Sequence, residues 1–147
     1  MAFKYLLIFF LSLSFIMGCA SVAQKKPDIY EIKVEEFSSS VKLLLSDINF
    51  LKEEILKVNA KRPSIQRIIS EADSLWLKGD VVGANLELER ALRISKDESA
   101  LYLRLSHLRL EQELYKESKA FAARGLLNDR ISSWEILLLN IYTNKQI

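Results

Sequence analysis

The chain of 147 residues has little of what builds metal, redox and phosphate sites. Cys19 is its only cysteine and His107 its only histidine, so no internal disulfide and no Cys-His cluster can form. Its four glycines form no Gly-rich loop that would cradle a phosphate. The formal net charge is only +2, which provides no basic surface for nucleic acid. We therefore expect no enzyme, no cofactor, no metal site and no nucleic-acid partner.

The beginning of the chain has the layout of a cleaved export signal. Lys4 supplies a positive charge, residues 5–17 form a short apolar run, and Ile16-Met17-Gly18-Cys19 follows. This tetrapeptide resembles the lipobox of bacterial lipoproteins, whose cysteine carries diacylglycerol and a further acyl chain such as palmitate after cleavage. An ordinary signal or a membrane anchor is the alternative, although the run is shorter than the roughly 20 residues that a span requires.

The resemblance implies a signal peptide over residues 1–18, lipidation of Cys19 and a lipidated tether over residues 19–28. Two acyl chains hold a protein stably on a bilayer, whereas one binds reversibly. The residue after the cysteine is Ala20 and not aspartate. In Gram-negative relatives, a residue other than aspartate at this position accompanies sorting to the outer membrane. We expect the protein to be anchored by lipid in the bacterial envelope, in the outer membrane and facing the periplasm.

Regularly spaced apolar residues predict one long helix over residues 29–62. The spacing alternates between four and three residues without interruption, which is a heptad pattern. Its members are Tyr30, Val34, Phe37, Val41, Leu44, Ile48, Leu51, Ile55 and Val58.

Three arrangements of this helix fit the pattern. β-branched residues at the a positions, with Asp47 and Lys52 spaced to pair across two helices, favour a parallel homotypic coiled coil. The a positions through which such a homo-oligomer would form are Val34, Val41, Ile48 and Ile55. Additional leucines widen the apolar stripe, which suits packing against the chain's own domain. Docking of a partner helix is the third arrangement.

Beyond Pro63, which ends the expected helix, the sequence repeats with a period of 34 residues. We predict one copy over residues 65–98, with Ser64 as helix cap, and a second over residues 99–130. Small side chains recur where the two helices of a hairpin would meet, because they let the helix axes approach. These pairs are Ala72 with Ser106, Ala84 with Ser118, and Ala91 with Gly125.

The small residues, the Gly79-Asp80 turn and aromatic Tyr102 and Tyr115 resemble the tetratricopeptide repeat (TPR). The resemblance covers residues 65–130 and implies stacked pairs of antiparallel helices. Glu113 stands where the second copy would have its turn glycine, which predicts a less sharp second turn.

Two further segments are expected to be helical. Leucines alternate from Leu101 to Leu105 as in a half-buried strand, but the 34-residue register predicts a helix there. After Asn128-Asp129, expected to be a capping pair, apolar residues at helical spacing predict a capping helix over residues 131–144. These residues are Trp134, Leu137, Leu138 and Ile141.

In the TPR family the first helices of the repeats line a concave groove that receives peptides or helices of partners. The matching faces carry apolar residues beside a polar strip, as a peptide groove requires. The expected partner-binding residues are Ile69, Asp73, Trp76, Leu103, Arg104, His107 and Glu111. The alternative is that the heptad helix folds back and fills this groove.

The expected fold is therefore all-α: a long heptad helix over residues 29–62, followed by a TPR-like domain over residues 63–147. The resemblance implies an outer-membrane lipoprotein that acts as an adaptor or scaffold for an unidentified envelope protein or peptide. The alternative is a self-associating structural protein, similar in layout to the Tol-Pal-associated cell-division coordinator.

Overall fold

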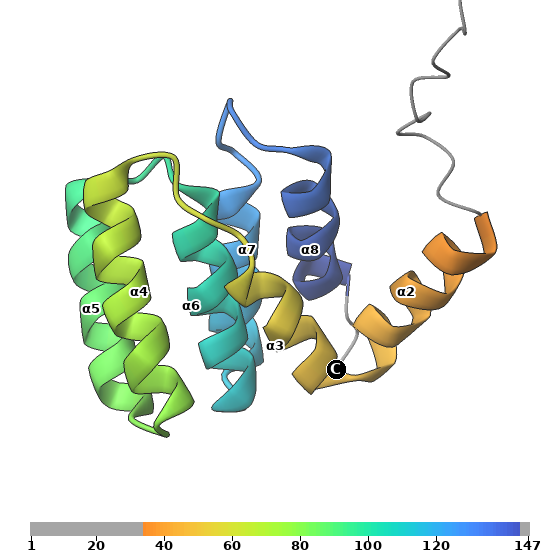
Figure 1. Ribbon diagram of the computed structural model, residues 1–147, viewed down its shortest axis with the longest axis horizontal. Coiled ribbons are helices and arrows are strands. Elements are labelled where there is room, and N and C mark those ends of the chain that lie inside the picture. Colours follow the sequence, from red (N-terminus) through yellow and green to blue (C-terminus); the bar gives the residue numbers. More distant parts are fainter. Residues whose placement is uncertain (1–33, 145–147) are drawn as a thin grey trace, which may run out of the picture. The chain divides into compact units, whose positions relative to one another are not determined.

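The computed structural model describes residues 34–144, and side chains from Phe37 to Asn144. The expected signal peptide, Cys19, the tether and the first residues of the heptad helix lie outside the described residues. Within the described range all regular structure is helical, as predicted (Figure 1). In chain order the helices are α2 (Val34–Ser46), α3 (Ile48–Leu56), α4 (Pro63–Leu77), α5 (Val81–Ile94), α6 (Ser99–Glu111), α7 (Tyr115–Gly125) and α8 (Ser133–Asn144).

The prediction of one continuous helix over residues 29–62 is wrong. The helix is interrupted at Asp47, whose backbone is extended and whose side chain accepts hydrogen bonds from Asn49 N at 2.9 Å and Phe50 N at 3.2 Å. Aspartate in this position satisfies the free N–H groups of a new helix, so it starts α3 instead of continuing α2. The second helix then ends at Leu56, well before the proline.

The connection between α3 and α4 is anchored where it enters α4. Buried Glu98 accepts hydrogen bonds from Lys61 N at 2.8 Å and Arg62 N at 3.1 Å. Pro63 is the first residue of α4, where its fixed φ and missing N–H suit a helix start. Ser64 is therefore not the cap, and Arg62 in the cap position makes no side-chain capping bond.

The helices α4 and α5 form one hairpin, and α6 and α7 form a second with the same geometry (Figure 1). The helices α4 and α6 end at Leu77 and Glu111, and α5 and α7 begin at Val81 and Tyr115, each pair 34 residues apart. All six small residues that were expected at the hairpin contacts are buried. The predicted period thus describes two equivalent helical hairpins.

The second turn is as sharp as the first, contrary to the prediction from Glu113. Gly79 has φ +85 and Glu113 has φ +61, so both adopt the left-handed conformation. Each is followed by the same hydrogen bond back into the preceding helix, from Asp80 N to Leu75 O at 2.9 Å and from Leu114 N to Arg109 O at 2.8 Å. A non-glycine residue is strained in this conformation, so packing of the hairpin holds Glu113 there.

The helix α6 lies at the centre of the fold. It contacts α3, α5, α7 and α8, and its residues are buried around the whole circumference. The alternating leucines from Leu101 to Leu105 therefore belong to a helix surrounded by neighbours, as the 34-residue register predicted, and not to a strand.

The last helix, α8, packs against α7 and α6 and buries Leu138 and Leu139. It begins with a capping box: Ser132 N donates to the Glu135 carboxylate at 2.8 Å, and Glu135 N donates to Ser132 Oγ at 3.2 Å. Ser132, and not Asn128-Asp129 as expected, is therefore the helix start signal.

Candidate functional site

The seven residues expected to line a partner groove do lie on one face of the hairpins. Three come from α4 and four come from α6, the first helix of each hairpin. Ile69, Leu103, Arg104 and His107 are fully buried, however, and Trp76 is 2% exposed. Of the two alternatives, an open groove and a groove filled by the heptad segment, the described structure shows the second, because the chain covers this face itself.

The helix that covers the face is α3, the second part of the heptad segment. Leu51 and Ile55 of α3 are fully buried, and α3 contacts α6 directly. Burial of an aliphatic side chain of this size contributes about 1.5–3 kcal/mol. The resting groove is therefore closed by an internal helix.

Lys52 of α3 fixes the middle of this contact. Its Nζ donates to Glu111 Oε1 at 3.0 Å and lies 4.2 Å from the centre of the Trp76 ring. The Trp76 indole donates in turn to Glu111 Oε2 at 2.7 Å. The Lys52 ammonium thus holds the covering helix to α6 by a charged hydrogen bond to Glu111 and to α4 by a cation–π contact with Trp76.

The guanidinium of Arg104 binds the carboxyl end of α3. It pairs with Asp73 through two hydrogen bonds, Nε to Oδ1 at 2.7 Å and Nη2 to Oδ2 at 2.8 Å. Its remaining donors reach the carbonyl oxygens of Val58 at 2.9 Å, Ala100 at 3.2 Å and Leu56 at 3.3 Å. A fully buried guanidinium is tolerable because all five N–H groups have acceptors. Two of these acceptors are terminal carbonyls of α3 or its connection, which an arginine stabilises.

These contacts lower the pKa of Glu111. Partial burial by itself raises its pKa, but hydrogen bonds from His107, Trp76 and Lys52 outweigh burial and hold the pKa at about 2. His107 is fully buried, and its Nδ1 lies 2.7 Å from the hydroxyl of Tyr142 in α8. The polar strip predicted on α6 is therefore a structural network that links α3, α4 and α8.

The residues proposed for a homotypic seam have different environments. Ile55 is buried in its own chain, Val41 is half-buried, and Ile48 is 39% exposed, while the side chain of Val34 lies outside the described residues. The expected cross-dimer pair is also engaged internally, since Asp47 caps α3 and Lys52 binds Glu111. The exposed apolar side chains of the heptad are Phe37 in α2 and Ile48 at the start of α3.

Sequence reasoning found the members of this face but missed Lys52 as the residue that closes it. The heptad placed it at a flanking position, and no local signal distinguishes a lysine that pairs within the chain from one that pairs with another copy. Among residues 34–144, no three histidine, cysteine, aspartate or glutamate side chains are arranged to hold a metal ion. None of the described helices combines the length and the apolar character that crossing a bilayer requires.

In comparisons with known proteins, no family model, no curated protein and no solved structure matches this chain. Its function must therefore be inferred from its residues and their geometry.

Proposed function

We propose that this protein is a lipid-anchored, TPR-like adaptor of the bacterial envelope, held in the outer membrane through acylated Cys19 and active by docking other proteins. The observation that carries the proposal is the pair of equivalent hairpins, 34 residues apart and with matching turns at Gly79 and Glu113. Stacked helical hairpins of this kind present extended surfaces for partners. The lipobox-like tetrapeptide ending at Cys19 supports the anchor.

The groove that repeat proteins commonly use is occupied by α3, so docking falls to the outer surface. The hairpin of α4 and α5 carries four aliphatic side chains that are more than half exposed: Leu77, Val82, Leu86 and Ile94. Val82 and Leu86 are one helical turn apart on α5, at 69% and 59% exposure. Adjoining exposed aliphatic side chains form a contiguous apolar surface, and such a surface marks interaction sites when it is large. This outer row of α5 is the face that we assign to the adaptor role.

The anchor is tested by metabolic labelling with palmitate and by membrane fractionation of the wild type and a Cys19→Ser variant. Incorporation of label into the wild type alone, with loss of the variant from the membrane fraction, supports the lipoprotein. An unlabelled wild type, or a variant that fractionates like it, contradicts the anchor.

The adaptor role is tested by a photo-crosslinking amino acid at Val82 or Leu86 in intact cells. The matched control places the same group at Leu88, which is fully buried on the same helix. The proposal expects one discrete adduct from both exposed positions, none from Leu88, and loss of the adduct in the Cys19→Ser background. Failure of both exposed positions to give a common adduct contradicts docking through this face.

A second candidate function is self-association as a structural element. The observation that favours it is the exposed apolar surface of α2, where Phe37 is 47% and Leu45 is 53% exposed. Sedimentation of residues 20–147 separates the two functions: concentration-dependent mass supports self-association, and a monomer at all concentrations eliminates it.

A further inference from the structure

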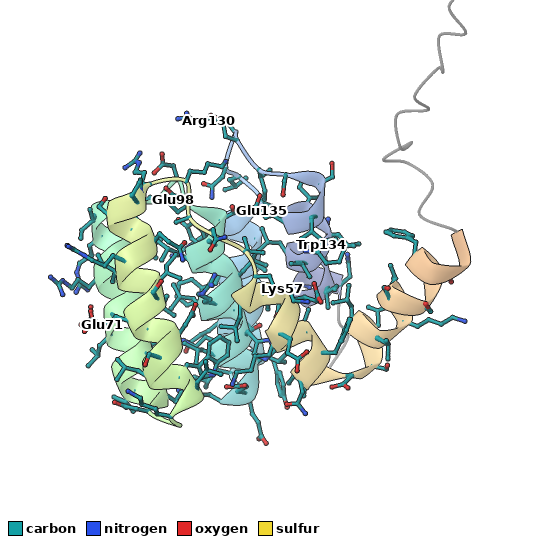
Figure 2. The ribbon with its side chains drawn as sticks, in the orientation of Figure 1. Lys57, Glu71, Glu98, Arg130, Trp134 and Glu135 are labelled. Atoms are coloured by element: carbon teal, nitrogen blue, oxygen red, sulfur yellow. The ribbon has the colours of Figure 1, made fainter. Side chains whose placement is uncertain are left out.

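A cleft of about 350 Å³ lies between the connection that follows α3 and the first turn of α8. Its walls include Glu54 of α3, then Lys57, Asn59 and Lys61 of the connection, and Ser132 and Trp134 at the start of α8. Figure 2 labels Lys57 on one wall and Trp134 and Glu135 on the other. The cleft is separate from the face that α3 covers and from the outer row of α5.

The carboxylates of the cleft are already engaged. Glu54 is paired with Lys57. Glu135 accepts hydrogen bonds from Ser132 N, Ser132 Oγ and the hydroxyl of Ser99, and these bonds lower its pKa although burial raises it. The start of α8 is thus capped from within the chain, and the cleft is not an open helix terminus that attracts an anion.

Three other polar groups that line the cleft are not engaged within residues 34–144. The ammonium of Lys61, the side-chain amide of Asn59 and the indole N–H of Trp134 make no hydrogen bond there, and Lys61 makes no ion pair, although its charge acts on Glu135. These groups offer several donors and one amide acceptor beside an aromatic ring. Concave sites with an apolar wall and a few convergent polar groups are the usual form of small-ligand sites.

The charges of the cleft define the class of ligand. Two glutamates and two lysines line it, so its formal charge is zero, and neither an anion nor a cation is favoured. A purely apolar ligand would displace water from the exposed Asn59 and Lys61 side chains without replacing its hydrogen bonds. A sugar has hydroxyl groups that both donate and accept, and an apolar ring face that packs on an indole. We propose that this cleft binds a short, uncharged saccharide, with Trp134 against the ring face and Asn59 and Lys61 on its hydroxyl groups.

The test is an NMR titration of ¹⁵N-labelled residues 20–147 with N,N′-diacetylchitobiose and, separately, maltose. The proposal expects a saturable shift of the Trp134 indole and Asn59 amide signals with at least one of the two sugars. The indole of Trp76, which is buried elsewhere, serves as an internal reference and should not move. Succinate, as a small dianion, should leave all three signals in place.

Variants distinguish binding from misfolding. Asn59→Ala and Lys61→Ala change exposed side chains and should each weaken binding about tenfold, the effect of one lost hydrogen bond. Trp134→Ala should abolish the shift of the Asn59 amide, while Lys78→Ala, an exposed lysine far along the chain, should change nothing. No saturable shift with either sugar, or a shift with succinate in place of the sugars, overturns the proposal.

Discussion

Replacing Ile55 by alanine measures whether α3 belongs to the core of its own chain. Ile55 is fully buried, so its truncation removes buried carbons and leaves a cavity that the surrounding helices fill only partly. The expected loss in the free energy of unfolding is about 2–5 kcal/mol. Ile48 is the matched control, since it occupies the same heptad position one repeat earlier but is 39% exposed. Its replacement by alanine should cost about 1 kcal/mol or less.

The assay is urea unfolding of residues 20–147, followed by circular dichroism at two protein concentrations well apart. The internal arrangement predicts a large shift of the midpoint for Ile55→Ala, a small one for Ile48→Ala, and no dependence on concentration. A coiled coil would make both residues part of one seam, with equal losses and midpoints that rise with concentration. Equal losses of that kind would refute the placement of α3 in its own groove.

Three further predictions follow from the turns, the acid site and the end helix. Glu113→Gly should stabilise the fold by about 0.5–1 kcal/mol, because relief of the left-handed strain exceeds the entropy cost of glycine, and Gly79→Ala should destabilise it by about 1 kcal/mol in the same urea assay. Glu111 has a folded pKa of about 2 against an ordinary 4.5, so its contribution is present above pH 4.5 and is lost as the pH falls toward 2. Melting temperature against pH should therefore fall less steeply across that window in Glu111→Gln than in the wild type, and parallel curves would contradict the network. Deletion of residues 131–147 should give an aggregating or molten domain, since it uncovers α6 and α7; a cooperative transition at an unchanged temperature would show that α8 is dispensable.

The sequence predicted the helical hairpins well because their signals are local and repeated. The 34-residue period located both turns, and the small residues located the contacts between helices. It did not predict the turn at Glu113, because the backbone strain of one residue is decided by packing of the whole hairpin. It did not predict the break at Asp47, because the heptad spacing continues across it. An aspartate can lie on a helix surface or cap a new helix, and only tertiary packing decides between them.

The sequence contains the signal that starts α8. Ser132 and Glu135 have the spacing of a capping box, a signal that outweighs the isolated Asn128-Asp129 pair. The burial of Arg104 was beyond sequence reasoning, because a charged residue on a groove face is expected to meet solvent. It becomes possible only when Asp73 and the terminal carbonyls of α3 surround the guanidinium.

The measurement that tests the closed groove most directly is the proximity of Lys52 to Trp76 in solution. The ammonium nitrogen lies 4.2 Å from the ring centre, so nuclear Overhauser effects should connect the Lys52 side chain to the indole protons. In a mixture of labelled and unlabelled protein, these effects should appear only within one chain. Their absence, or their appearance only between chains, would contradict a groove filled by its own helix.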